Sequence, residues 1–116
     1  MPAVPRLLSL TTAVPPHALP QEQVKSWARE FFKDRSRDIE RLLPAFDNAG
    51  IDNRYSCVPL AWYGEPHGWE EKNRLYLENA VDILERTARD ALTAAGLEGR
   101  DIDAIVVAST SGIATP

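Results

Sequence analysis

The stretch that decides the fold is Ile105-Val106-Val107-Ala108-Ser109-Thr110-Ser111-Gly112-Ile113-Ala114-Thr115-Pro116. With Ala104 before it, residues 104–108 form a continuous apolar run rich in β-branched residues, which is typical of a strand buried on both faces. A loop of small and hydroxyl-bearing residues follows. Strand ends that open into such loops are where α/β proteins place binding and catalytic groups. We therefore expect a central strand followed by a functional loop, in the front part of a larger protein.

A long amphipathic helix is predicted before this strand. Charged residues fill one face, and apolar residues recur at helical spacing on the other, at Leu77, Val81, Leu84, Ala88, Ala91, Leu92 and Ala95. Gly96 suits the position just after a helix end, where glycine adopts a left-handed backbone without steric cost. The pattern predicts a helix that is followed, after a short connection, by the final strand.

The first half of the chain predicts a strand and two helices. Residues 7–12 have the composition of a strand, which the prolines at 15–16 end. Residues 20–32 carry one apolar face at helical spacing. A second, short helix follows over residues 39–46, and Pro44 should kink or shorten it.

Residues 51–57 then predict a strand or extended arm, and residues 59–68 a loop rich in proline and glycine. Three aromatic residues in or next to this loop should pin it to a core or an interface: Trp62, Tyr63 and Trp69. The resulting order of β, α, α, β, long α, β indicates a layered α/β fold.

Composition excludes several classes of function. The net charge of −4, from 13 Lys and Arg against 17 Asp and Glu, gives no basic footprint for nucleic acid. No apolar run is long enough to span a membrane, and no signal peptide is evident. Cys57 is the only cysteine, so no intrachain disulfide can form. We expect a cytoplasmic protein that binds neither nucleic acid nor membrane.

Few residues suggest chemistry on their own. We interpret Cys57 as a small buried residue, since neither His17 nor His67 is near it in sequence. These three residues also lack the spacing of a metal site, so we expect no metal. Thr110 and Ser111 carry hydroxyls that can donate and accept hydrogen bonds. Their loop is either a site or an ordinary turn that caps a helix, and the pattern alone leaves both open.

Four segments together resemble the type III polyketide synthases, the chalcone-synthase-like enzymes. The strongest is DIDAIVVASTSGIATP (101–116), which resembles the segment before that family's nucleophile. The others are HALPQEQV (17–24), NRYSCVP (53–59) and YLENAVDILERTARDALTAAGL (76–97). The resemblance implies that residues 1–116 are the N-terminal portion of a thiolase-like, chalcone/stilbene-synthase-type domain of αβαβα layers, within a homodimer.

The implied activity is that of an acyltransferase. Members of the family load an acyl group from an acyl-CoA onto a cysteine, extend it with malonyl-CoA by decarboxylative condensation, and cyclise the product. No separate cofactor is implied. The family's catalytic Cys, His and Asn correspond to positions beyond residue 116, and Cys57 does not match the nucleophile.

The resemblance also implies roles for individual residues. Thr110 and Ser111 would line the reaction cavity, and Thr115 would reach across the dimer interface into the partner's cavity. Arg41 would bind CoA at the tunnel mouth, although Pro44 and Asn48 replace two residues that are basic in plant members. A structural role is expected for Arg54, through an ion pair.

Three alternatives stay open. The aromatic residues between 62 and 69 favour the bacterial members that make alkylresorcinols or alkylpyrones. The segment Gly50-Ile51-Asp52-Asn53-Arg54 also fits the related ketoacyl-carrier-protein synthase III. A non-enzymatic interaction module would explain the missing catalytic residues in another way.

Overall fold

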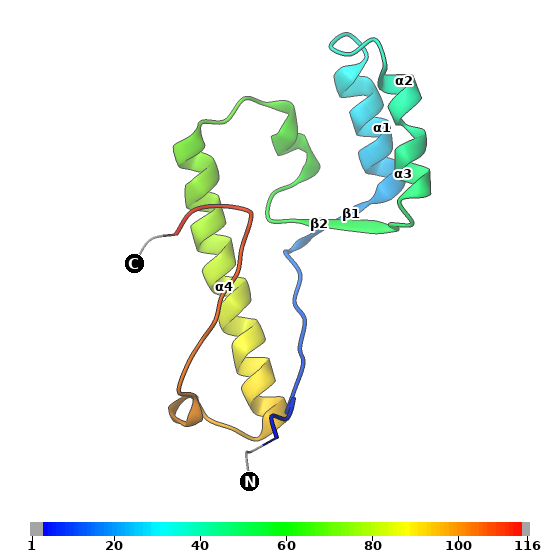
Figure 1. Ribbon diagram of the computed structural model, residues 1–116. Coiled ribbons are helices and arrows are strands. Elements are labelled where there is room, and N and C mark those ends of the chain that lie inside the picture. The colour runs from blue at the N-terminus through cyan, green and yellow to red at the C-terminus, as the bar shows by residue number, and fades with distance from the viewer. Residues whose placement is uncertain (1–3, 115–116) are drawn as a thin grey trace. The chain divides into compact units, whose positions relative to one another are not determined.

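The computed structural model describes residues 4–114, which divide into two compact units (Figure 1). The sheet unit comprises Val14–His67. The α4 unit comprises Met1–Ala13 and Gly68–Pro116, of which residues 4–13 and 68–114 are described.

The sheet unit is a two-stranded ribbon with helices inserted between its strands. Strand β1 (His17–Pro20) pairs antiparallel with β2 (Asn53–Ser56), so that His17 lies opposite Ser56. Between them lie α1 (Gln21–Phe32), α2 (Ile39–Leu42) and α3 (Pro44–Asn48). The predicted break is confirmed: Pro44 occupies the first turn of α3, where its missing N–H costs nothing. Gly50 then turns the chain with φ of 64°.

The core of the sheet unit is small and partly polar. Its buried apolar side chains are Ala28, Leu43 and Val58, and its buried polar ones are Gln21 and Ser56. The loop after β2 contains a 3₁₀ helix, η1 (Leu60–Gly64), whose Tyr63 hydroxyl is hydrogen-bonded to Ser56 Oγ at 2.8 Å. Tyr63 thus attaches this loop through its hydroxyl, while its side chain stays 43% exposed and is not packed into the core.

The α4 unit is organised along one long helix, α4 (Trp69–Ala95). The predicted helix and its end are confirmed. Gly96 adopts φ of 68°, and Leu97 N–H donates to the Leu92 carbonyl at 3.0 Å, which closes the last turn. A 3₁₀ turn, η2 (Gly99–Asp101), follows. The prediction that Trp69 helps to pin the preceding loop is wrong, because Trp69 is the first residue of α4.

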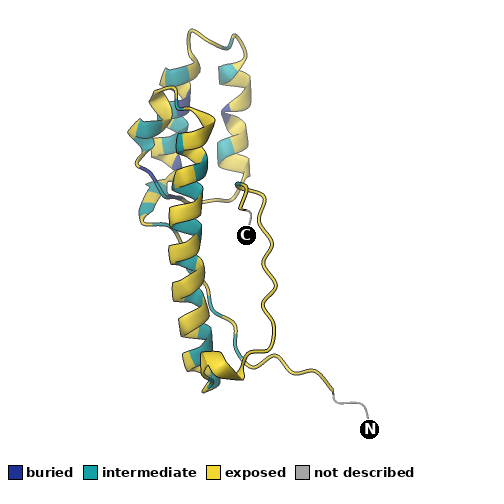
Figure 2. Cartoon of the chain, turned by 90° about the vertical axis from the view of Figure 1, so that its left-hand side faces the viewer, coloured by how far each residue is buried: buried dark blue, intermediate teal, exposed yellow. Residues whose placement is uncertain are grey.

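Two predicted strands are absent from the described residues. Residues 7–12 and 104–108 are extended but form no sheet, because no described strand lies beside them to complete a ladder. Figure 2 shows the exposure of residues 104–108, and Val106 is 96% exposed. Apolar β-branched composition predicted the extended backbone correctly, but a strand also requires hydrogen-bonded neighbours.

The N-terminal segment is held to α4 by side chains. Ser9 Oγ donates to the Ala91 carbonyl at 2.8 Å, and Thr11 Oγ1 donates to the Thr87 carbonyl at 3.0 Å. Residues 9 and 11 therefore follow the C-terminal half of α4 without any backbone pairing. Among residues 4–114, no helix combines the length and the apolar character that crossing a membrane requires.

Candidate functional site

The loop of residues 109–114, here called the hydroxyl loop, is attached to α4 through Asn73. Asn73 Nδ2 donates to the Ile113 carbonyl at 3.1 Å, and Ile113 N–H donates to Asn73 Oδ1 at 3.1 Å. A carboxamide can do this because it carries both a donor and an acceptor. The side chain of Asn73 thus pairs with the Ile113 residue much as a neighbouring strand would.

A second contact lies one residue earlier in the loop. Gly112 lies against the ring of Tyr76, and a Cβ added at position 112 would overlap ring atoms Cγ, Cδ1 and Cε1. Asn73 and Tyr76 are three residues apart on α4, so their side chains leave the helix on the same face. Glycine is required at position 112 by this close approach.

The hydroxyl loop brings Thr110 and Ser111 together on an exposed surface. Ser111 N–H donates to Ser109 Oγ at 3.3 Å, which forms a local turn. Within residues 4–114, the hydroxyls of Thr110 and Ser111 have no hydrogen-bond partner, so both can bind a ligand. Thr115, the third expected cavity residue, lies outside the described residues.

Arg41 belongs to the sheet unit. It lies in the last turn of α2, it is exposed, and its guanidinium forms no ion pair within the described part of the chain. A free guanidinium of this kind can contact a phosphate. Arg54 corrects an expectation: its Nε donates to the neutral Oε1 of Gln21 at 2.9 Å, so its partner is an amide and not a carboxylate. Gln21, which comes from the start of α1, therefore has the role that we expected of an acidic residue.

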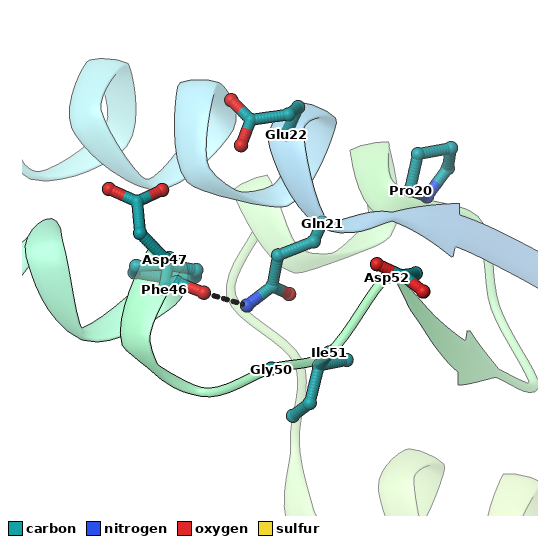
Figure 3. Close-up of a pocket in the computed structure, with 8 residues that line it drawn as sticks. All are labelled: Pro20, Gln21, Glu22, Phe46, Asp47, Gly50, Ile51 and Asp52. Atoms are coloured by element: carbon teal, nitrogen blue, oxygen red, sulfur yellow. Dashed lines mark hydrogen bonds between the residues drawn. The ribbon is translucent and has the colours of Figure 1, made fainter.

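The sheet unit also contains an open depression, which Figure 3 shows. Gln21 lies at its base, where its Nε2 donates to the Phe46 carbonyl at 2.9 Å and its N–H donates to the Asp52 carbonyl at 2.8 Å. Three carboxylates line the depression, from Glu22, Asp47 and Asp52. An acidic lining disfavours an anionic ligand such as a CoA phosphate, and Arg41 is not part of it.

No metal centre is formed by the described residues, since they contain no group of three or more His, Cys, Asp or Glu that could hold an ion. Cys57 is half-buried between Ser56 and Val58, both buried. Sequence reasoning identified the hydroxyl loop but missed the two α4 residues that hold it, Asn73 and Tyr76. Their partners are 40 and 36 positions away in the sequence, beyond the reach of local patterns; only the glycine among the hydroxyl residues indicated a close approach.

Comparison with known proteins gives a consistent set of relatives, although no protein-family model matches the chain. A putative chalcone synthase from Bacillus subtilis (strain 168) is 31% identical over 115 residues, which cover 95% of this chain and 32% of the relative. The 1,3,6,8-tetrahydroxynaphthalene synthase of Streptomyces peucetius subsp. caesius is 29% identical over 105 residues, covering 90% and 28%. The chain thus spans about a third of the length of these relatives.

A solved structure is also similar. The crystal structure of 1,3,6,8-tetrahydroxynaphthalene synthase from Streptomyces coelicolor A3(2), a bacterial type III polyketide synthase, matches with a TM-score of 0.66 and 26% identity. The match covers 73% of this chain and 24% of that one. Sequence and structure comparisons therefore indicate the same group of enzymes.

Proposed function

We propose that this chain, which is related in sequence and fold to part of the type III polyketide synthases, forms the N-terminal portion of such a synthase and shapes its reaction cavity. The observation that carries the proposal is the match over 95% of this chain to a third of a chalcone-synthase relative. The expected mixed α/β class with a thiolase-like fold is confirmed by the likeness to the solved synthase.

The reaction proposed for the whole protein is acyl transfer with decarboxylative condensation. An acyl group from an acyl-CoA starter is transferred to a cysteine, and the thiolate of CoA leaves. Malonyl-CoA then loses CO₂ to give an enolate, whose carbon attacks the acyl thioester carbonyl. A C–C bond forms, the C–S bond to the cysteine breaks, and the extended thioester is later cyclised. The cysteine, histidine and asparagine of this chemistry are proposed to lie beyond residue 116.

Within this reaction the hydroxyl loop would form a wall of the cavity. The Thr110 and Ser111 hydroxyls are exposed and unpaired among residues 4–114, so they can donate hydrogen bonds to carbonyl oxygens of a growing poly-ketone chain. Their small size leaves room for that chain, and a larger residue would shorten it. We propose that Thr115 reaches the partner's cavity in a homodimer. Arg41 would contact the phosphates of CoA through its unpaired guanidinium. A cytoplasmic location is proposed from the lone cysteine.

One assay tests the proposed function. The complete protein that contains this chain is incubated with a series of acyl-CoA starters and, in parallel reactions, either radiolabelled malonyl-CoA or a radiolabelled malonyl-carrier protein. The proposal expects release of CO₂ and free CoA, with a cyclised aromatic or pyrone product. A ketoacyl group attached to a carrier protein would instead indicate the activity of ketoacyl-carrier-protein synthase III, the enzyme that the segment Gly50–Arg54 of this chain also resembles. Absence of any condensation would overturn both and leave the interaction module.

A further inference from the structure

We propose that Asn73 is a positioning residue for the hydroxyl loop: it sets where Thr110 and Ser111 lie, and thereby which intermediates the loop accepts. This inference rests on the proposed function for its catalytic consequence, although the attachment itself does not. Nothing in the implied roles of the loop residues extends to α4.

The hydroxyl loop has few attachments besides Asn73. Among described residues, the hydroxyl loop forms three hydrogen bonds that reach or lie within it. One is the internal bond from Ser111 N–H to Ser109 Oγ, and the other two are those with Asn73. The loop carries no helix or strand, and its residues are exposed or half-exposed. Among the described residues, every hydrogen bond between this loop and α4 therefore comes from Asn73.

Asn73 and Tyr76 together restrict the geometry of the hydroxyl loop. Two hydrogen bonds fix the Ile113 residue in both distance and direction, since one is donated and one is accepted. The contact of Gly112 with the Tyr76 ring restricts the neighbouring residue from the same helix face. Thr110 and Ser111 lie only two residues and one residue before that contact, so little freedom remains between them and α4. In Figure 1 the red segment that carries this loop returns along α4 toward its N-terminal half.

The attachment depends on the carboxamide of Asn73. Aspartate has the shape of asparagine but no donor, so it would place an oxygen against the Ile113 carbonyl. Alanine removes both bonds, yet it is a better helix former than asparagine by roughly half a kcal/mol. Asn73→Ala therefore separates the effect on the helix from the effect on the loop: α4 gains stability while the hydroxyl loop loses its attachment.

The test uses the complete protein with Asn73→Ala and Asn73→Asp, and Lys72→Ala as the matched control. Lys72 is the adjacent exposed residue of α4 and holds no hydrogen bond from its side chain within residues 4–114. Amide hydrogen exchange across residues 109–114 reports the attachment. Product distribution and the KM for the acyl-CoA starter report its consequence. Having both Asn73 variants covers the case in which one fails to fold.

The inference predicts that Asn73→Ala speeds exchange at Ile113 by about fivefold or more, the effect of losing one to two net hydrogen bonds. Asn73→Asp, which keeps an acceptor for the Ile113 N–H, should speed it less. It also predicts a change in the ratio of products or a KM raised about three- to tenfold, without a lowered melting temperature of the protein. Lys72→Ala should match the parent in all three. Unchanged exchange in the Asn73 variants would overturn the inference, whether or not the protein condenses malonyl-CoA. Faster exchange with an unchanged product ratio and KM would overturn the catalytic consequence. An inactive parent with faster exchange in the variants would reject the proposed function and leave the attachment standing.

Discussion

Gly112 lies so close to the ring of Tyr76 that no side chain fits between them. This relationship joins a loop residue to a helix residue 36 positions earlier, and it accounts for glycine in a loop that does not need a positive φ at that position. The contact can be tested without an activity assay, because it depends only on the space that is available between position 112 and the side chain at position 76.

Gly112→Ala should lower the free energy of unfolding by about 1–3 kcal/mol, the usual cost of forcing atoms into an occupied space. Adding Tyr76→Ala should return most of that loss, because the space is then free. A double-mutant cycle by chemical denaturation measures the coupling between the two positions, which we expect to exceed about 0.5 kcal/mol. Gly99→Ala is the control, since nothing lies within 4 Å of a Cβ there. Additive effects of the two changes would contradict the contact.

Gly96→Ala tests the end of α4. The residue has φ of 68° and open space around its Cβ direction, so the only penalty is that of the left-handed backbone. We expect a loss of about 1–2 kcal/mol in the free energy of unfolding. Gly96→Asn should lose less, because asparagine tolerates this conformation. Equal stability of the alanine and asparagine variants, measured by thermal unfolding, would show that the helix ends in another way.

Gln21→Leu tests the buried amide of the sheet unit. The substitution leaves the Phe46 carbonyl and Arg54 Nε without their present partner, and we expect a loss of about 1–3 kcal/mol in the free energy of unfolding. Gln23→Leu makes the same chemical change at an exposed position of the same helix, and it should stay within about 0.5 kcal/mol of the parent. If both variants lost equal stability, the hydrogen bonds of Gln21 would not be the cause.

Arg41→Ala tests the proposed CoA contact. The KM for an acyl-CoA starter should rise about two- to fivefold, the range of a solvent-exposed charge pair, and the rise should shrink at high salt. The KM for the matching pantetheine thioester, which lacks the nucleotide phosphates, should not change. Arg37→Ala, another exposed arginine of the same unit, is the control. An equal effect on both thioesters would assign Arg41 a structural role.

Local signals predicted the elements whose causes are local. The apolar spacing along α4, the left-handed Gly96 after it, and the proline that starts α3 all act within one or two helical turns, and each was found where expected. Residues 7–12 and 104–108 were wrong as strands among the described residues. Their composition predicts extended backbone, but a ladder depends on neighbours that the pattern of one segment does not specify.

Part of the candidate site could likewise be predicted from local sequence, and part could not. The hydroxyls of Thr110 and Ser111 could be identified from the sequence because they stand next to one another after an apolar run. Their roles came from the family resemblance and stay predictions. The attachment through Asn73 could not be foreseen, since an asparagine within a charged helix ordinarily faces water and its partner, Ile113, is 40 residues away. Gln21 is a similar case, as its bonds with Phe46 and Arg54 depend on the folded sheet unit.

The most direct test of the central claim, that the hydroxyl loop forms a wall of the reaction cavity, is the product profile of Thr110 variants of the complete protein. Thr110→Val keeps the shape and removes the hydroxyl, whereas Thr110→Phe fills the space. We predict that Thr110→Phe shortens the products or narrows starter use, with thermal unfolding within a few degrees of the parent because the residue is exposed. Thr110→Val should lower kcat with chain length retained. Mass spectrometry showing the parent's products, in the parent's proportions, from a folded Thr110→Phe variant would contradict the account.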